Sequence, residues 1–396
     1  MKLTQDEVMQ YIQETDVKFI RLAFCDVFGR QKNVAIMPGE LERAFQYGIA
    51  VDASSIPGFG GALRSDLFLH PDPSTLTALP WRPQTGRVVQ MLCSVTNPDG
   101  SPFEADTRAL LRRWVEAAER EGYSFSIGLE MEFYLFRLDE GGEPTTIPCD
   151  RAGYMDIAPE DRCENVRREI CLTLEQMGIL PESSHHESGP GQNEIDFRYA
   201  DPLKAADNAL TFRTVVKTIA AQHGLWADFS PRPLADHDGS GMHLNVSLRD
   251  GSGRFLLAEV IAGLLAHIRE TTLFLNPVEN SYQRLGRDKA PRSVSWSAEN
   301  RNQLIRVPAA QGEYRRAELR SPDSAANPYL AVALVLSSVL DSLHRGLPLP
   351  ESADALAGSP VPCLPADLSE ARALARESAF VRQTVPGMVL DAYLRH

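Results

Sequence analysis

Residues 124–136 read SFSIGLEMEFYLF, and their alternation of side chains predicts a β-strand. Residues two apart in a β-strand share one face of the sheet. Glu130 and Glu132 therefore lie on one face, and Leu129 and Met131 lie on the other. We expect the apolar face to pack against a core, which leaves two carboxylates side by side on the open face of the strand.

Three further segments carry acids or a histidine at the same spacing. They read HHESGPGQNEIDF, GSGMHLNVSL and EYRRAELRSPD, and they supply Glu187, Glu194, His243 and Glu318. The acids of a single strand of this kind usually lie on a face exposed to solvent. Apolar residues flank each of these four segments, however, so the strands are expected to be buried, and a buried unpaired carboxylate is costly. Five acids and one histidine suit Mg²⁺ or Mn²⁺, which take oxygen ligands and bridge phosphates. The convergence predicts a metal-dependent phosphoryl-transfer enzyme.

The composition bounds the class of protein. The chain has 396 residues, enough for two domains, and its 43% hydrophobic and 23% charged residues are typical of a soluble globular protein. A net charge of −13 argues against nucleic acid as a partner, because a phosphate backbone needs a basic surface. The N-terminus lacks the apolar run of a signal peptide, and no stretch is long enough to span a bilayer. Six scattered cysteines without paired metal spacing predict a reduced, cytoplasmic protein.

Helix and strand patterns predict an α+β protein of two domains. Residues 1–100 combine a small sheet with helices, and the turn-rich VTNPDGSPFEADT follows as a boundary. In residues 101–396, long helices alternate with the motif strands. The segment 348–368 is rich in proline and small residues and is expected to be a surface loop. The expected helices cover residues 4–16, 38–48, 107–121, 159–177, 202–223, 257–275 and 328–345.

Arginines form a second constellation. An arginine usually lies on the surface and makes salt bridges, but beside a metal cage its fork-shaped guanidinium clamps carboxylates and phosphates. Phosphoryl transfer depends mostly on positioning and charge neutralisation, so we expect the clamp. No phosphate loop and no dinucleotide fingerprint occur in the sequence. The arginines concerned are Arg284, Arg301, Arg306, Arg316 and Arg320.

Taken together, these segments resemble the type I glutamine synthetase family. DASSIPGF, residues 52–59, is similar to the family's Asp-Gly-Ser-Ser-Ile loop, and SDLFLHPDPST follows it. The motif strands, NSYQRL, NRNQLIRVP and RRAELRSPDSAANPYLA match in the family's order. The similarity runs from Lys18 to Leu394, nearly the whole chain. It implies a small β-grasp-like N-terminal domain followed by a large catalytic domain, an antiparallel sheet with flanking helices.

The resemblance also implies an activity. Family members use ATP to phosphorylate the γ-carboxylate of glutamate, and ammonia then displaces the phosphate. Two or more Mg²⁺ or Mn²⁺ ions in each active site are implied, together with a ring of subunits whose active sites lie between neighbours. The chain ends at VLDAYLRH, where typical members continue into a tail that links two rings, so both a hexamer and a dodecamer stay open.

Carried over residue by residue, the resemblance assigns a role to each motif side chain. The metal nearer the amino acid would be held by Glu132, Glu187 and Glu194. The metal on the ATP phosphates would be held by Glu130, His243 and Glu318. ATP and its phosphates would be contacted by Asn245, Ser247, Arg306, Arg316 and the catalytic Arg301. Glutamate would be bound by Gly239, Arg284 and Arg320, with Asp238 beside it. The amine pocket would consist of Ser55, Tyr154, Glu187 and Asp52, the base that deprotonates ammonium.

Several departures from the family pattern bear on the substrate. The family flap reads Arg-Leu-Val-Pro-Gly-Tyr-Glu-Ala-Pro, and its glutamate takes the last proton. Here the flap is RLGRDKAP, one residue shorter, and Lys289 falls where that glutamate should be. A lysine repels ammonium, and Asp288 could substitute only if the shorter loop shifts its register. Asp238 replaces an asparagine, so an acceptor-only carboxylate stands beside the substrate. Gly61 replaces an arginine found in members that glutamine inhibits, which puts that control in doubt.

The metal and phosphate residues are all present while the amine side is altered. The sequence therefore predicts an ATP-dependent ligase that joins glutamate to a primary amine other than ammonium. An ordinary glutamine synthetase is the alternative. A non-catalytic ring that binds nucleotide or glutamate as a regulator is the alternative from another class, and the intact metal cage counts against it. A phosphagen kinase would have no use for the loop that carries Asp52.

Overall fold

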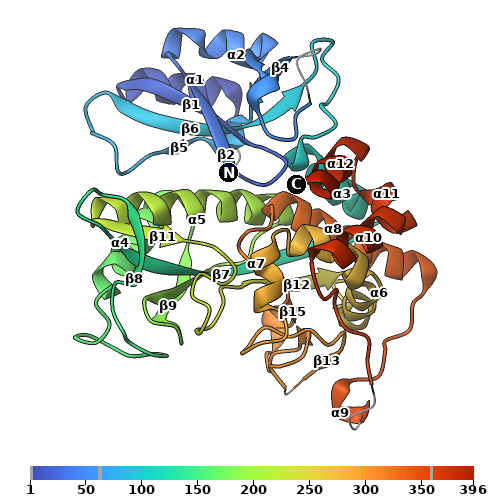
Figure 1. Ribbon diagram of the computed structural model, residues 1–396. Coiled ribbons are helices and arrows are strands. Elements are labelled where there is room, and N and C mark those ends of the chain that lie inside the picture. The colour runs from blue at the N-terminus through green and yellow to red at the C-terminus, as the bar shows by residue number, and fades with distance from the viewer. Residues whose placement is uncertain (1–2, 61–64, 299, 357–359) are drawn as a thin grey trace. The chain divides into compact units, whose positions relative to one another are not determined.

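The structure is a computed structural model that describes residues 3–60, 65–298, 300–356 and 360–396. Gly61, and with it the expected loss of glutamine control, lies outside these residues. The chain forms two compact units (Figure 1). The division at residue 100 stays a prediction. The first unit consists of Met1–Leu110, Glu175–Gly178 and Pro386–His396, and the second of Leu111–Leu174 and Ile179–Val385.

A six-stranded sheet forms the core of the first unit. The strand order is β2-β1-β6-β4-β3, and β5 pairs with β6. β1 runs antiparallel to β2 and parallel to β6. Ile20 and Leu22 of β1 and Val89 and Met91 of β6 are fully buried, so this central pair carries the core. The bounds are β1 Val17–Cys25, β2 Gln31–Ile36, β3 Ile49–Asp52, β4 Asp66–Pro71, β5 Thr77–Ala78 and β6 Arg87–Thr96.

Short helices complete the first unit. A capping box begins α1, because the Thr4 hydroxyl accepts from the Glu7 N–H and the Glu7 carboxylate accepts from the Thr4 N–H. The helices expected at residues 4–16 and 38–48 are confirmed, with shorter bounds. The bounds are α1 Gln5–Glu14, η1 Pro38–Glu40, α2 Leu41–Tyr47, η2 Ala53–Ser55, η3 Pro73–Thr75 and α12 Gly387–Arg395.

A nine-stranded sheet organises the second unit. Its order is β13-β14-β15-β12-β7-β10-β9, and β8 and β11 also pair with β7. The described strand pairs are antiparallel except β13 with β14, so the expected antiparallel catalytic sheet is confirmed. The bounds are β7 Ser124–Leu138, β8 Pro144–Pro148, β9 Pro181–His186, β10 Gln192–Phe197, β11 Leu225–Asp228, β12 Met242–Arg249, β13 Trp296–Ser297, β14 Ile305–Arg306 and β15 Ala317–Leu319.

Long helices cover one face of this sheet. α5 packs on β7 and β11, α6 packs on β12, and α8 packs on both helices (Figure 1). Leu129 and Met131 are at most 1% exposed, and Phe133 meets Phe212 of α5 with ring centroids 6.1 Å apart. The acids that alternate with them in β7 therefore lie on the face without these helices. The bounds are α3 Thr107–Arg120, α4 Glu164–Gln176, α5 Pro202–Gln222, α6 Leu257–Leu275, α7 Glu279–Arg284, η4 Gly312–Tyr314, α8 Pro328–Arg345, α9 Ala353–Leu356, α10 Leu368–Glu377 and α11 Ala379–Thr384.

Two local expectations are wrong. The helix expected from Pro159 begins only at Glu164. The carboxylate of Asp161 accepts from the Cys163 N–H at 2.9 Å and pairs with Arg167, so this stretch forms a turn that leads into the helix. The proline-rich segment 348–368 is not all loop, because α9 lies within it.

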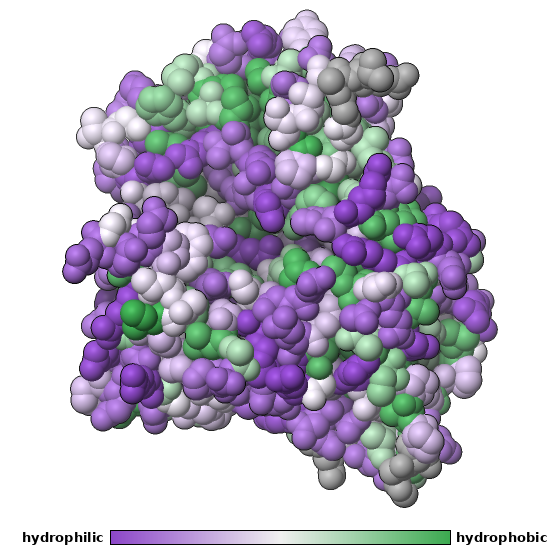
Figure 2. Space-filling view, in the orientation of Figure 1, coloured by the Kyte–Doolittle hydropathy of each residue, from purple (hydrophilic) through white to green (hydrophobic). Residues whose placement is uncertain are grey.

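Hydrophilic residues cover most of the visible face of each unit, with hydrophobic residues scattered among them (Figure 2). Among the described residues, no helix combines the length and the apolar character that crossing a membrane requires. The apolar helices α6 and α8 instead pack on each other inside the second unit.

Candidate functional site

The register of three neighbouring strands gathers acids on the open face of the nine-stranded sheet. His243 of β12 lies opposite Glu130 of β7, and Glu130 lies opposite Asp196 of β10. Glu132 lies opposite Glu194 in the same way. Opposite residues on one face of a sheet are close neighbours, with Cβ atoms about 5 Å apart. The pairing of β12, β7 and β10 therefore forces four carboxylates and one imidazole into a single patch.

The first cluster in this patch consists of Glu130, His243 and Glu318, whose ligand atoms all lie within 4.8 Å of one another. His243 Nδ1 is 3.2 Å from Glu130 and 3.6 Å from Glu318. Asn245 donates to the other oxygen of Glu130 at 2.8 Å. Burial alone would raise the pKa of Glu130, but the hydrogen bonds of His243 and Asn245 and the charge of Arg316 lower it to about 2. Glu130 is therefore an anion at neutral pH.

Two arginines surround the third member of this cluster. Glu318 lies on β15 and is 2% exposed. Arg306 Nη1 donates to its Oε2 at 3.0 Å, and Arg320 Nη1 donates to its Oε1. A buried carboxylate needs such partners, because removing a charge from water costs several kcal/mol. Glu318 is thus both a candidate metal ligand and the anion that holds two arginines in place.

The second cluster consists of His185, Glu187 and Glu194, again with ligand atoms within 4.8 Å of one another. His185 Nε2 is 3.1 Å from Glu187 and 3.9 Å from Glu194. Burial raises the pKa of Glu194 well above its ordinary value, and the charge of Glu132 adds to the effect. Burial acts on Glu187 too, but the His185 hydrogen bond and the charge of Lys289 outweigh it and lower that pKa to about 2.

Glu132 stands slightly apart from the second cluster. Its Oε2 accepts from the Gly241 N–H at 2.8 Å and from Gln192 Nε2 at 3.3 Å. Among the described residues, His185 joins Glu187 and Glu194 in the place where the resemblance implied Glu132.

The donor set of the patch fits hard divalent cations. Carboxylate oxygens with one imidazole nitrogen are ligands that Mg²⁺ and Mn²⁺ accept. Burial, and then the charges of neighbouring acids, raise the pKa of Glu194, and a nearby divalent cation would oppose this shift. Glu130, His243 and Glu318 would hold one ion. The second would be held by Glu187 and Glu194, with Glu132 or His185.

A pocket of about 290 Å³ lies beside the first cluster. Glu130 lines it together with Asn245, Ser247 and Arg316, three of the residues expected to contact ATP. Arg316 Nε donates to Asn245 Oδ1 at 2.8 Å. Arg301, by contrast, is exposed in the turn before β14 and is not part of this lining. Lining residues that the sequence analysis missed include Glu182, Ser183, Asp196, Phe197, Tyr199, Glu313, Tyr314 and Arg315. The size and mixed polarity of the pocket suit a nucleotide.

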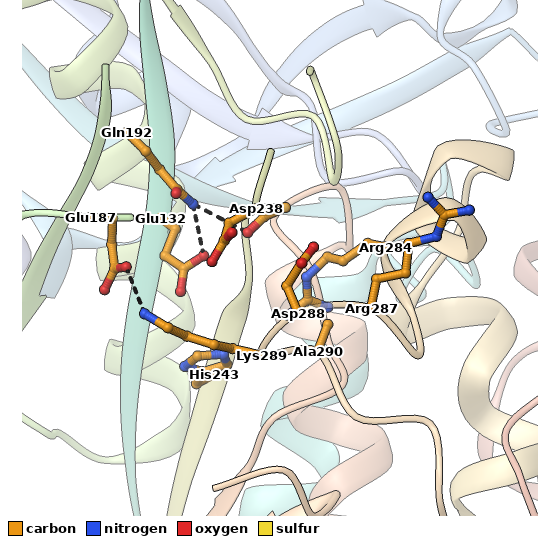
Figure 3. Close-up of a pocket in the computed structure, with 11 residues that line it drawn as sticks. Glu132, Glu187, Gln192, Asp238, His243, Arg284, Arg287, Asp288, Lys289 and Ala290 are labelled. Atoms are coloured by element: carbon orange, nitrogen blue, oxygen red, sulfur yellow. Dashed lines mark hydrogen bonds and ion pairs between the residues drawn. The ribbon is translucent and has the colours of Figure 1, made fainter. Parts of the chain in front are cut away.

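A second pocket of only about 20 Å³ is lined by three of the residues expected to bind glutamate, Asp238, Gly239 and Arg284, but not by Arg320 (Figure 3). A Cβ atom on Gly239 would lie 2.4 Å from the Pro231 carbonyl oxygen. One on Gly241 would lie 2.7 Å from both Arg284 Nη2 and His243 Nε2. Both glycines are required because the backbone passes so close to these groups. The lining residues are Glu132, Glu187, Gln192, Asp238, Gly239, His243, Arg284, Arg287, Asp288, Lys289 and Ala290.

Arginine donors are buried around this second pocket. Arg284 is 2% exposed, and its Nη1 and Nη2 donate to the carbonyl oxygens of Ser321 and Arg320 at 2.8 and 3.3 Å. The Nε atoms of Arg284 and Arg320 have no hydrogen-bond partner among the described residues. Burial and the charge of Asp288 raise the pKa of Asp238. Unpaired buried donors beside a carboxyl group suit a ligand that carries both a carboxylate and an amine.

The shortened flap presents its lysine, and not its aspartate, to the acids of the site. Residues 286–290 form a tight turn in which Asp288 has a φ of 51°. The carboxylate of Asp288 is 3.1 Å from Arg232 Nη1. Lys289 Nζ lies 3.3 Å from Glu187 Oε2 (Figure 3). Asp288 lines the pocket, but its pairing with Arg232 means that the register shift in which it replaces the flap glutamate does not occur in this structure.

Tyr154 of the expected amine pocket lies in the second unit next to Lys289. Lys289 Nζ is 4.5 Å from the centre of the Tyr154 ring, which also meets the His185 ring edge-on at 5.6 Å. Tyr154 belongs to a loop whose ends, Cys149 and Cys163, are brought together by the fold although they lie 14 residues apart and the sequence spacing did not connect them.

Asp52 and Ser55 of the expected amine pocket lie in the first unit. Both are exposed, on the turn that follows β3. Asp52 Oδ1 accepts from the Ser54 N–H at 2.9 Å, and hydrogen bonds from Ser54 lower the pKa of Asp52. The carboxylate is therefore ionised and exposed to solvent.

Two acid-patch residues that the sequence analysis missed lie at the same spacing as those it found. His185 precedes Glu187 by two residues, and Asp196 follows Glu194 by two. Asp196 and Glu194 both lie on β10, whereas His185 lies on β9 and Glu187 follows the end of that strand. Applying the spacing rule to the whole of each motif would have found both residues.

Comparison with known proteins covers nearly the whole chain. Residues 16–98 match the family model "Glutamine synthetase, beta-Grasp domain", and residues 104–396 match "Glutamine synthetase, catalytic domain". A glutamine synthetase of Methanosarcina mazei is 45% identical and is aligned over 99% of this chain and 92% of its own length. One of Clostridium saccharobutylicum is 46% identical over 89% and 83%. A solved structure described as "GmaS/ADP complex-Conformation 1" has a TM-score of 0.89 at 25% identity, covering 100% of this chain and 94% of that one.

Proposed function

The chain belongs to the glutamine synthetase family and is a ligase, and we propose that it joins glutamate to a primary amine other than ammonium. Members of this family use ATP and divalent metal ions. The observation that carries the proposal is the position of Lys289. Its ammonium pairs with Glu187, on the amine side of the site, where the family's flap carries a glutamate. Two clusters that could hold metal ions, Glu130 with His243 and Glu318, and His185 with Glu187 and Glu194, meanwhile support phosphoryl transfer.

The two pockets divide the substrates between them. ATP would occupy the larger pocket, beside Asn245 and Arg316. The similar GmaS structure is described as an ADP complex, which supports nucleotide binding by this fold. Glutamate would bind among the residues that line the smaller pocket, after side chains that fill this pocket have moved to admit it. The buried Nε of Arg284, which has no hydrogen-bond partner among the described residues, would donate to the carboxylate of glutamate. Glu130 lines the first pocket and His243 the second, and the two side chains are 3.2 Å apart. The γ-phosphate and the γ-carboxylate would therefore meet at the acid patch.

Two chemical steps follow from this arrangement. An oxygen of the glutamate γ-carboxylate attacks the γ-phosphorus of ATP, and ADP leaves. Asp52 takes one proton from the bound ammonium group, and the free amine nitrogen then attacks the γ-carbonyl carbon. Inorganic phosphate leaves and takes the second proton of the nitrogen. Bound divalent ions supply neutralisation of the charge on the transferring phosphoryl group. Arg306 and Arg316 hold positive charge near that group, and we assign the same role to the exposed Arg301.

The base and the acid patch come from different units, and we propose that they also come from different subunits. Asp52 and Ser55 would reach the site of a neighbouring chain, as family resemblance implies, so the active assembly would be a ring. Both hexamers and stacked hexamers agree with this arrangement. We place the protein in the cytoplasm, where ATP and glutamate are available.

The altered flap favours a larger amine over ammonium. A flap glutamate would attract ammonium and accept its last proton, whereas Lys289 supplies neither the negative charge nor that base. The flap is also one residue shorter than the family pattern, which would leave more room for an alkyl group. An ordinary glutamine synthetase is the second candidate, and the names of relatives at 45% identity favour it. A non-catalytic regulator is disfavoured, because all six metal-site residues of the motifs lie on the open face of the sheet or at its edge.

A substrate screen tests the proposed function. Phosphate release would be measured with ATP, Mg²⁺ and glutamate against ammonium, methylamine, ethanolamine and a diamine. We expect at least one primary amine to exceed ammonium in kcat/KM, and Lys289→Glu to move the preference towards ammonium. If ammonium is the best substrate of the unmodified protein, the chain is an ordinary glutamine synthetase.

A further inference from the structure

The side chain of Lys289 ends among the groups that an amine substrate needs. Its Nζ is 3.3 Å from Glu187 Oε2 and 2.8 Å from Ser188 Oγ. It also lies over the ring of Tyr154, 4.5 Å from the centroid. A carboxylate, a hydroxyl oxygen and an aromatic face are the three kinds of partner that recognise a primary ammonium group. The site is therefore built to bind an alkylammonium, and Lys289 is one.

The free room near this ammonium is small. The pocket that Lys289 lines with Glu187 measures about 20 Å³, which holds one water molecule and no organic amine. Lys289 Nζ itself fills the place beside Glu187 and over the Tyr154 ring, so an amine can take that place only when the Lys289 side chain has moved. Figure 3 shows the extended side chain crossing from its turn to Glu187.

The turn can stay in place while the side chain leaves. The Lys289 side chain is 53% exposed, so it can swing into solvent. The backbone is held separately, because Asp288 pairs with Arg232 and the Lys289 carbonyl accepts from Arg320 Nη2 at 3.5 Å. Displacement of Lys289 is therefore a side-chain rotation and does not require the flap to unfold.

We propose that Lys289 is a built-in pseudosubstrate, whose primary alkylammonium occupies the amine pocket until an incoming primary alkylamine displaces it. The proposal rests on the proposed function for the identity of the substrate class. The occupied pocket reduces the apparent affinity of any amine by the fraction of molecules in which Lys289 is bound. An exposed ion pair and a cation–π contact together favour the bound arrangement about tenfold. Ammonium is the weakest competitor, since it has no alkyl chain to lie along the Tyr154 ring.

Binding of n-butylammonium, which reproduces the lysine side chain, tests the proposal. Isothermal titration calorimetry would compare the full-length protein with Lys289→Met, Lys289→Gln and Lys289→Arg, each with Mg²⁺, glutamate and a non-hydrolysable ATP analogue. We expect Lys289→Met and Lys289→Gln to bind about tenfold more tightly than the unmodified protein. Lys289→Arg keeps the positive charge and is expected to bind n-butylammonium as weakly as the unmodified protein does. Lys217→Met is the matched control, because Lys217 is also an exposed lysine above an aromatic ring, 5.8 Å from the centre of Phe229.

The outcomes separate the pseudosubstrate from the proposed function. Equal binding by all these proteins, undetectable binding by all of them, or weaker binding by Lys289→Met would overturn the pseudosubstrate. A gain that appears only without Mg²⁺ would overturn it too, because Lys289 would then have left the metal-loaded pocket. Tighter binding by Lys289→Met without ligation of any amine would support the pseudosubstrate and refute the proposed function. If the protein ligates amines but Lys289→Met binds n-butylammonium as the unmodified protein does, the proposed function is supported and the pseudosubstrate is refuted.

Discussion

Replacing Glu318 by glutamine tests the acid patch at its most heavily connected residue. Glu318 faces His243 at 3.6 Å and accepts from Arg306 and Arg320, and its side chain is 2% exposed. Glutamine keeps the shape and one acceptor oxygen but removes the negative charge. The substitution therefore probes charge at this position and leaves the packing of β15 intact.

The structure sets the size of two separate effects. Two unit charges about 4 Å apart interact by about 4 kcal/mol at an effective dielectric constant of about 20. Loss of one such interaction with a bound Mg²⁺ or Mn²⁺ ion weakens its binding by about 10³-fold. Removing one partner of a buried ion pair also destabilises a protein by about 3–5 kcal/mol, and the retained acceptor oxygen of glutamine places Glu318→Gln near the lower end.

The two effects need two assays. Mn²⁺ binding by electron paramagnetic resonance and ATP turnover against Mg²⁺ concentration report the metal, and urea unfolding reports stability. Glu169→Gln is the control, because it removes the same charge from an exposed pair with His223. Mn²⁺ binding by Glu318→Gln within about threefold of the unmodified protein would show that Glu318 is not a metal ligand. An unchanged unfolding midpoint would show that its arginine pairs do not stabilise the fold.

Three further predictions concern other parts of the chain. Burial alone would lower the pKa of His267, but hydrogen bonds to two carboxylates outweigh it and raise the pKa above 6.5. The stability that the charged ring contributes is complete below pH 6.5 and is lost as pH rises through the raised pKa. The excess unfolding free energy of the unmodified protein over His267→Gln should therefore shrink between pH 5 and 9, and a constant difference in urea titrations would contradict this. Gly241→Ala should lower kcat/KM for glutamate at least about 100-fold, since its Cβ displaces substrate-site groups. Gly39→Ala, which meets no atom within 4 Å, should match the unmodified enzyme in the same steady-state assay, and equal values for both variants would refute the close approach. Asp52→Asn should lower kcat about 10²–10⁴-fold while acyl phosphate can still be trapped by hydroxylamine, and an unchanged kcat would show that Asp52 is not the base.

The elements that local sequence determines were predictable. α6 and α8 have the bounds expected from the sequence, because long apolar periodicity defines them, and Asn327 caps the start of α8. The cluster of Glu130, His243 and Glu318 follows from alternation along three strands that prove to be neighbours. The sequence therefore indicated which side chains could bind a metal ion before it was known which strands are neighbours.

Side-chain positions that depend on contacts between residues far apart in the chain could not be predicted from the sequence. The direction of Asp288 is fixed by Arg232, which lies 56 residues earlier in the chain, so no reading of the flap alone could decide between Asp288 and Lys289. The Cys149–Cys163 pair depends on the path of the loop between them. Glu132 stands apart from the second cluster, where His185 lies instead, and its Oε2 accepts from the Gly241 N–H, a contact between residues 109 apart in the chain.

The placement of the acid patch on strands and of Lys289 on a turn has a consequence for how this chain can change over evolutionary time. An inserted or deleted residue in β7 would exchange its two faces and destroy the acid patch. The strand that carries Glu130 and Glu132 therefore does not tolerate changes of length. The turn at residues 286–290 carries no such constraint, because surface connections tolerate length changes. A change of length in this turn would alter what meets the incoming nitrogen without shifting the register of β7, β10 and β12, because the turn lies outside these strands. The acceptor side of the site can therefore vary while the acid patch keeps its geometry.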